Sequence, residues 1–183
     1  MADSAPALSG TGPLTLADDS HRAKVLVKAS AGGAVASTLA TGFGSARALD
    51  DDLLCVGCGV GEWLLLGPPG PADGLVARWR AEPDDGLVTV LDATPGRTVL
   101  RLSGAGAGAA LAKVCAVDMA AAADGTAVRT SVARVPSLVV RTGAAFLVAC
   151  ERSYGEYLAD ALLDAGAEFG IVRASKIPSN DRR

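Results

Sequence analysis

Apolar and small residues follow one another along this chain in a pattern that occurs twice. Residues 25–40 (VLVKASAGGAVASTLA) and 99–114 (VLRLSGAGAGAALAKV) each contain a short apolar run, a turn of small residues and the start of a helix. Residues 61–80 and 144–163 each contain an apolar run that leads into an amphipathic stretch. Because self-similarity of this kind is typical of a repeated structural unit, the sequence predicts two related halves.

Each half ends on one more short apolar strand, at residues 86–91 (GLVTVL) and 168–172 (EFGIV). The expected order in each half is therefore strand, helix, strand, strand, helix, strand, which is the ferredoxin-like arrangement. We predict an α+β fold with two pseudo-duplicated, ferredoxin-like βαββαβ lobes. Such a lobe carries both helices on one face of its sheet, so the other face needs a cover. The two lobes can cover each other, or one of them can recruit another subunit.

These predictions divide the chain into four parts. The first lobe spans residues 22–95 and the second spans residues 96–173. Residues 1–21 are rich in Ala, Ser, Gly, Pro and Asp without periodicity, and residues 174–183 are polar and charged. We expect these two end segments to be flexible or to lie along a partner.

The clearest helix prediction is for residues 153–165. Ser153 can cap the first turn, and Glu156 can reach back to it, which is a capping box. Gly166 supplies the stop. The residues on one stripe of this helix are Tyr154, Tyr157, Leu158, Ala161, Leu162 and Ala165. Because a stripe of this kind normally faces a core, we expect both tyrosines mainly to pack there.

Composition and charge restrict the classes of partner. The net charge is -3 and the sequence lacks a cluster of Lys and Arg, which argues against nucleic-acid binding. The apolar runs are far shorter than the roughly 20 residues that a membrane-spanning helix needs. The first 20 residues lack the basic and apolar regions of a secretory signal. We therefore expect a cytoplasmic protein that binds neither nucleic acid nor a membrane and keeps its thiols reduced.

One motif has the form of a dinucleotide-binding loop. Gly104, Gly106 and Ala109 match G-x-G-x-x-A after a predicted strand. A true fingerprint needs an acidic residue at the end of the next strand, whereas Asp118 and Asp124 lie in a predicted loop. The favoured interpretation is close packing of a helix on a strand, with nucleotide binding as the alternative.

The cysteines and the single histidine offer little chemistry. Cys55 and Cys58 have the C-x-x-C spacing of a zinc or redox pair, but no second pair or His lies at a comparable spacing. We favour half-buried packing thiols, with redox sensitivity and metal binding as alternatives. Cys115 and Cys150 lie in apolar surroundings. His21 lies at the edge of the N-terminal segment, so we expect a solvated or interface side chain.

Three segments together carry a family resemblance. They are residues 61–70 (GEWLLLGPPG), 90–119 (VLDATPGRTVLRLSGAGAGAALAKVCAVDM) and 151–170 (ERSYGEYLADALLDAGAEFG). They look like an acid-Trp-Leu strand, an Asp-x-Ser/Thr turn before a small-residue helix, and an Arg-Ser-aromatic-x-x-Tyr-Leu helix. In these features the chain resembles the gamma subunit family of heterotetrameric sarcosine oxidases, which is related in architecture to folate-binding aminomethyltransferase-like proteins.

The resemblance implies a non-catalytic subunit of a flavoenzyme. That enzyme would oxidatively demethylate sarcosine to glycine, pass the one-carbon unit to tetrahydrofolate and pass electrons to oxygen. FAD, FMN, NAD, tetrahydrofolate and zinc would belong to the partners, which would be larger flavoprotein subunits, and this chain would hold no cofactor or metal. The motif residues that carry over by position are Glu62, Trp63, Asp92, Arg97, Arg152, Ser153, Tyr154 and Tyr157. We interpret them as structural or subunit-contact positions, and none is expected to be catalytic.

Alternatives remain open at this point. The chain could be a free-standing folate-binding or aminomethyl-transferring protein, in which Asp92 or Glu62 would hold the pterin. It could instead be a homodimeric scaffold. Trp63 in an apolar strand and Trp79 on a helix stripe favour core packing, with a partner contact as the alternative because Trp is enriched at interfaces.

Overall fold

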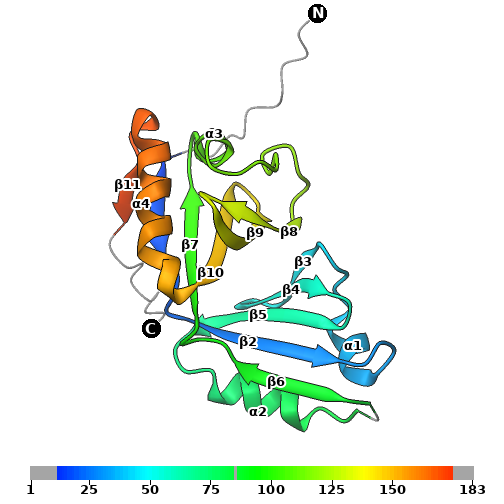
Figure 1. Cartoon of the computed structure of the whole chain (residues 1–183). Helices are drawn as coiled ribbons and strands as arrows, with labels where there is room; N and C mark the ends of the chain where they lie inside the picture. Colours follow the sequence, from blue (N-terminus) through cyan, green and yellow to red (C-terminus); the bar gives the residue numbers. More distant parts are fainter. Residues whose placement is uncertain (1–11, 85, 175–183) are drawn as a thin grey trace, which may run out of the picture.

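The computed structural model describes residues 12–84 and 86–174, which form two β-sheets packed face to face. Each sheet carries its helices on the side away from the other sheet (Figure 1). The predicted α+β fold with two ferredoxin-like lobes is confirmed. The two lobes cover each other, as one of the two sequence-based alternatives required.

The first sheet has the strand order β3-β4-β5-β2-β6, with antiparallel pairs throughout. Its strands are β2 (Arg22–Ala29), β3 (Ala46–Asp50), β4 (Leu53–Gly59), β5 (Glu62–Pro69) and β6 (Val88–Asp92). Its helices are α1 (Ala34–Leu39) and α2 (Asp73–Ala81). The ferredoxin-like core is β2, β4, β5 and β6, and β3 is an additional edge strand.

The second sheet repeats this plan with the order β11-β1-β7-β10-β9-β8. Its strands are β1 (Thr15–Asp18), β7 (Arg97–Ser103), β8 (Ala127–Val132), β9 (Val135–Thr142), β10 (Ala145–Glu151) and β11 (Val172–Ala174). Its helices are α3 (Ala107–Ala112) and α4 (Gly155–Gly166), with 3₁₀ turns at Arg152–Tyr154 and Ala167–Phe169. Strand β8 corresponds to β3 of the first lobe.

Strand β1 is the main departure from the expected organisation. The expectation that residues 1–21 form a flexible segment is wrong for residues 15–18, which insert between β7 and β11. Leu14 and Leu16 are each 1% exposed and belong to the core of the second lobe. Burial of these two side chains and pairing on both edges outweigh the cost of ordering the segment. Residues 1–11 and 175–183 lie outside the described part of the chain.

A central core lies between the two sheets. It consists of Val56, Cys58, Leu64, Leu66, Val99, Ala127, Leu138, Val140, Leu147 and Ala149. Separate cores lie between each sheet and its own helices. Because strands such as β5 and β10 are buried on both faces, their sequences are continuous apolar runs and not alternating patterns. Trp63 and Trp79 are 6% and 1% exposed, which confirms the prediction of core packing.

Helix α4 begins two residues later than the capping box predicted. Ser153 lies in the preceding 3₁₀ turn, and no side chain caps the helix. The Glu156 carboxylate instead accepts hydrogen bonds from Arg173 at 3.1 Å. The capping-box prediction is therefore wrong. The first residue of the helix is Gly155, and a Cβ at this position would lie only 2.4 Å from the hydroxyl oxygen of Thr98 on β7.

The two tyrosines of this segment are not core residues. Tyr154 and Tyr157 are 46% and 56% exposed, so the prediction that they pack inside is wrong. The buried stripe of α4 consists of Gly155, Leu158, Ala159, Leu162, Ala165 and Gly166. This stripe is centred on Leu158 and Leu162, which turns the tyrosines to the rim of the buried face.

Candidate functional site

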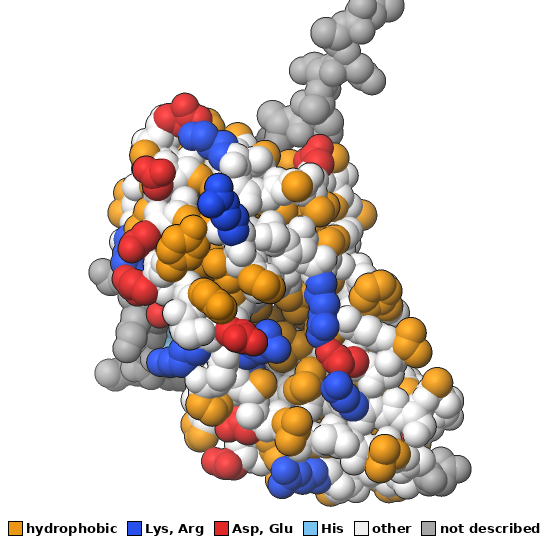
Figure 2. Space-filling view, in the orientation of Figure 1, with side chains coloured by type: hydrophobic (Ala, Val, Ile, Leu, Met, Phe, Trp, Pro, Cys, Tyr) orange, Lys and Arg blue, Asp and Glu red, His pale blue; other side chains and the backbone are white. Residues whose placement is uncertain are grey.

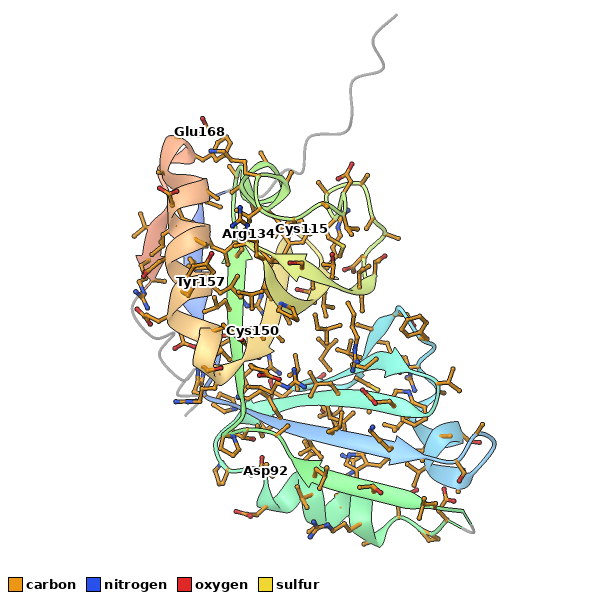
Figure 3. The ribbon with its side chains drawn as sticks, in the orientation of Figure 1. Asp92, Cys115, Arg134, Cys150, Tyr157 and Glu168 are labelled. Atoms are coloured by element: carbon orange, nitrogen blue, oxygen red, sulfur yellow. The ribbon has the colours of Figure 1, made fainter. Side chains whose placement is uncertain are left out.

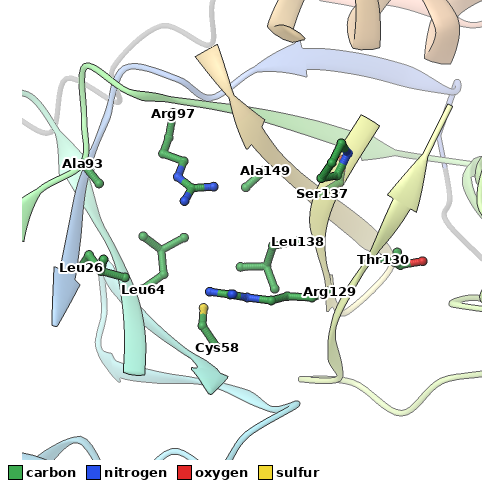
Figure 4. Close-up of a pocket in the computed structure, with 11 residues that line it drawn as sticks. Leu26, Cys58, Leu64, Ala93, Arg97, Arg129, Thr130, Ser137, Leu138 and Ala149 are labelled. Carbon is green, nitrogen blue, oxygen red and sulfur yellow. The ribbon is translucent and has the colours of Figure 1, made fainter. Parts of the chain in front are cut away.

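A partly apolar cleft lies between the two sheets. This cleft has a volume of about 350 Å³ and is drawn in Figure 4. Its lining residues are Leu26, Cys58, Leu64, Ala93, Arg97, Arg129, Thr130, Pro136, Ser137, Leu138 and Ala149. Figure 2 shows hydrophobic side chains inside the hollow between the lobes and charged side chains along its rim. Several lining residues, among them Cys58, Leu64, Leu138 and Ala149, also belong to the central core, so the cleft adjoins that core.

Arg97 enters the cleft from the second sheet. It occupies the first position of β7 and faces the same way as Val99, which belongs to the central core. The side chain is half-buried and extends between Ala93 and Ala149 toward Leu64 (Figure 4). Its ladder partner is Glu151 of β10. Within the described ranges, no carboxylate lies within 4 Å of the Arg97 guanidinium.

A three-residue ion cluster closes one rim of the cleft. Glu62 of β5 accepts a hydrogen bond from Arg129 of β8, across the lobe boundary. Its other carboxylate oxygen lies 3.0 Å from the Lys28 Nζ. Partial burial raises the pKa of Glu62, but the hydrogen bond from Lys28 and the charge of Arg129 outweigh this effect and hold the pKa below its usual value. The Glu62 carboxylate thus forms ion pairs with both Arg129 and Lys28.

Cys55 and Cys58 do not form a pair of thiols. Cys55 faces the core between the first sheet and its helices, whereas Cys58 faces the central core and lines the cleft. Burial raises the pKa of both thiols, that of Cys55 to about 11. Thiols that stay protonated are poor nucleophiles and poor metal ligands. All four cysteines are buried, which agrees with the packing interpretation.

Asp92 shapes the connection between the lobes. Its carboxylate accepts a hydrogen bond from the Thr94 backbone N–H at 2.8 Å, at the end of β6. The Thr94 hydroxyl accepts one from the backbone N–H of Lys24 at 2.9 Å, and the Ala93 N–H donates to the Lys24 carbonyl at 2.8 Å. The Asp-x-Thr motif is therefore a turn that ties the interlobe connection to β2.

Lys24 is fully buried beside this turn. Its Nζ donates hydrogen bonds to the carbonyl oxygens of Ser20 at 2.7 Å and Arg22 at 2.9 Å. Burial, and next the positive charge of Arg152, lower the pKa of Lys24 to about 8. Asp18 and Asp92 act in the opposite direction, but in the described part of the chain neither carboxylate lies at ion-pair distance from the Nζ.

The remaining motif residues lie elsewhere. The backbone N–H of Arg152 donates to Gly96 at 3.0 Å, which anchors the 3₁₀ turn before α4. The Tyr157 hydroxyl donates to the carbonyl of Ala133 at 3.3 Å, and Tyr154 is solvent-exposed. Figure 3 shows Tyr157 on α4 of the second lobe, well separated from Asp92 in the first. Trp63 is buried and donates from Nε1 to the Thr41 carbonyl at 2.8 Å.

Of the predicted site residues, Arg97 lines the cleft, and Glu62 is connected to it through its ion pair with Arg129, which also lines the cleft. Asp92 lines a separate pocket at the interlobe connection, so the folate-binding alternative, which needs Asp92 or Glu62 to hold the pterin, stays open. Sequence reasoning missed Arg129, Lys28 and Lys24. The alternation of β8 indicated on which face Arg129 lies, but no local signal pairs it with a residue 67 positions away.

The glycines of the G-x-G-x-x-A motif serve packing. Gly104 and Gly106 have φ values of +102° and +85°, and a Cβ at Gly104 would lie 2.1 Å from the Pro13 carbonyl oxygen. A Cβ at Gly106 would press on Phe169 at 3.2 Å. Strand β7 has antiparallel neighbours on both sides, so the loop does not belong to a parallel βαβ unit. These glycines pack closely against the segment before β1 and the turn after α4, and the expected close approach of α3 to β7 stays a prediction.

Neither a metal site nor a membrane-spanning helix is found among the described residues. Among them, no group of three or more His, Cys, Asp or Glu side chains is placed to hold a metal ion. No helix in residues 12–84 and 86–174 is both long and apolar enough to span a membrane.

Comparison with known proteins identifies relatives in sequence. The chain is 36% identical over 116 residues to the sarcosine oxidase gamma subunit of Corynebacterium sp. strain P-1. The aligned part is 61% of this chain and 55% of that protein, so the match spans about half of the curated relative. No family model matches the chain.

Solved structures extend the likeness to nearly the whole fold. A chain of the heterotetrameric sarcosine oxidase from Corynebacterium sp. U-96, solved with pyrrole 2-carboxylate, superimposes with a TM-score of 0.73 and 26% identity. The match covers 93% of this chain and 91% of that chain. Aminomethyltransferase T from Bartonella henselae matches with a TM-score of 0.68 and 19% identity over 90% of this chain and 48% of that chain, which shows a shared fold. The resemblance to sarcosine oxidase gamma subunits is confirmed.

Proposed function

We propose that this chain is a non-catalytic gamma subunit of a heterotetrameric sarcosine oxidase-like flavoenzyme. The observation that carries the proposal is the match along 93% of this chain to a chain of a heterotetrameric sarcosine oxidase, together with 36% identity to a curated gamma subunit. The motif residues fit this role, because their observed contacts build turns, ion pairs and packing.

The parent complex would oxidatively demethylate sarcosine to glycine and pass the one-carbon unit to tetrahydrofolate. FAD, FMN, NAD, tetrahydrofolate and zinc would reside in larger flavoprotein subunits, which are the proposed partners. We place the complex in the cytoplasm, and four buried cysteines without disulfide partners fit a reducing compartment.

Exposed apolar side chains at sheet edges support partner binding. Leu91 of β6 is 49% exposed and Val172 of β11 is 56% exposed. Both strands lie at the edge of their sheet. An edge strand with exposed apolar residues is a site at which another chain can bind, and proteins normally cover or charge such edges. Leu87, which precedes β6, is 79% exposed and adds to this surface.

Co-expression tests the proposal. The tagged chain is produced together with the flavoprotein subunits encoded beside it, and the same subunits are produced without it as the control. We expect a yellow complex that contains this chain and forms glycine from sarcosine, and a loss of assembly when the chain is omitted. Elution of the chain alone, with no flavoprotein alongside, would contradict the proposal.

A further inference from the structure

The cleft between the sheets has the properties of a small-molecule site. Its volume of about 350 Å³ lies within the range of about 300 to 1,000 Å³ that ligand pockets occupy. Leu26 and Leu64 of the first sheet face Leu138 and Ala149 of the second. These side chains give an apolar body two walls to rest against, one from each lobe.

The polar groups at the cleft carry an excess of positive charge. Arg97 and Arg129 line the cleft, and the Glu62 carboxylate that pairs with Arg129 is shared with Lys28 outside it. Glu151 lies opposite Arg97 in the β-ladder, but the structure places it no closer than 4 Å to that guanidinium within the described chain. The Cys58 thiol adds no negative charge, because burial raises its pKa.

Arg97 is the group that most needs a partner. A half-buried guanidinium has lost part of its hydration, and a carboxylate in its plane restores two charge-assisted hydrogen bonds. Arg97 of β7 and Arg129 of β8 both enter the cleft from the second sheet, and Figure 4 shows Leu64 and Leu138 beside them. Arg129 already has the Glu62 carboxylate, so Arg97 is the free anchor.

We propose that this cleft binds a small organic carboxylate with a compact apolar or aromatic body. The carboxylate binds Arg97, and the body packs between Leu64 and Leu138. Arg129 closes the rim, held there by Glu62. The ligand contacts both sheets, so its affinity depends on how far apart the two lobes lie at the cleft. This proposal goes beyond the subunit role.

Calorimetry and NMR titration of the full chain with benzoate and phenylacetate test the proposal, with neutral benzamide as the matched probe. We expect saturable binding of at least one carboxylate and much weaker binding of benzamide. Arg97→Gln should weaken binding about tenfold or more, because a charge-assisted bidentate contact is lost. The matched control is Arg78→Gln, since Arg78 lies on α2 and contacts Asp50 and Trp79 away from the cleft.

A second variant tests the location without touching a charge. Leu26→Phe fills part of the cleft from a half-buried position, and circular dichroism verifies that it folds. We expect it to weaken binding while the arginines remain. The proposal is overturned if neither carboxylate gives saturable binding, if benzamide binds equally well, or if Arg97→Gln and Leu26→Phe bind as the unaltered chain does.

Discussion

Glu62 on β5 and Arg129 on β8 form an ion pair that joins the two lobes at the rim of the cleft. Lys28 of the first lobe lies 3.0 Å from the same carboxylate. The Glu62 side chain is only 20% exposed, whereas Lys28 and Arg129 are each more than half exposed. Glu62 is thus the central member of the cluster, and its removal affects both cations.

Replacing Glu62 by Gln should therefore destabilise the protein modestly. Pairs with exposed cations are worth at most about 1 kcal/mol each, so we expect a loss of about 1 kcal/mol in urea unfolding. The pKa of Glu62 is lower in the folded state, so its contribution is present above the unfolded pKa and is lost as the pH falls through the folded value. The unaltered protein and Glu62→Gln should converge in stability at acid pH. Equal pH dependence of the two would contradict the prediction.

Because of Lys24, the free energy of unfolding should increase as the pH rises through the alkaline range. Its folded pKa of about 8 lies below the ordinary lysine value of 10.5, so the unfolded chain binds the extra proton between these values. The free energy of unfolding should rise across that window, by at most about 3 kcal/mol. Urea unfolding at a series of pH values should show this rise in the unaltered chain and not in Lys24→Met. Lys113→Met is the control, because Lys113 is 43% exposed and pairs with Glu168.

The sequence correctly predicted those strands and helices that form because of the order of apolar and polar residues within the segment itself. The continuous apolar run at Trp63 marks a strand buried on both faces, and the periodicity around Leu158 and Leu162 marks α4. The start of α4 was misjudged because Ser153 and Glu156 have the spacing of a capping box, whereas Glu156 pairs with Arg173, which is remote in sequence. Gly155, the first residue of the helix, lies against Thr98 of another strand, which no local pattern shows.

The cleft and β1 depend on partners that are remote in sequence. The four residues of β1 are too few to show a period, and the strand forms because β7 and β11 supply both ladders. Glu62 and Arg97 were singled out through the family resemblance, but Arg129 was not. A pattern along one strand cannot reveal that a residue of the other lobe completes the ion pair.

Gly104 should be far less tolerant of substitution than Gly143. Both have positive φ values, but only Gly104 faces backbone, because a Cβ there would lie 2.1 Å from the Pro13 carbonyl oxygen. Gly104→Ala must push the segment before β1 away, and we expect a loss of about 2–4 kcal/mol. Gly143→Ala meets no atom within 4 Å and should cost about 1 kcal/mol. Thermal unfolding of the two variants compares them directly, and equal losses would refute the close-contact explanation.

The apolar edge at Leu91 on β6 and the apolar edge at Val172 on β11 should each be required for assembly with partner subunits. A charge placed on an apolar contact has to be desolvated on binding, so Leu91→Asp and Val172→Asp should each reduce co-purification of the flavoprotein subunits by about tenfold or more. Because both side chains are about half exposed, the isolated variants should unfold at nearly the same temperature as the unaltered chain. Val60→Asp is the matched control, since Val60 is 92% exposed in the turn between β4 and β5, away from both edges. If Val60→Asp abolishes co-purification while the two edge variants retain it, the contact surface lies at the β4–β5 turn and not at the sheet edges.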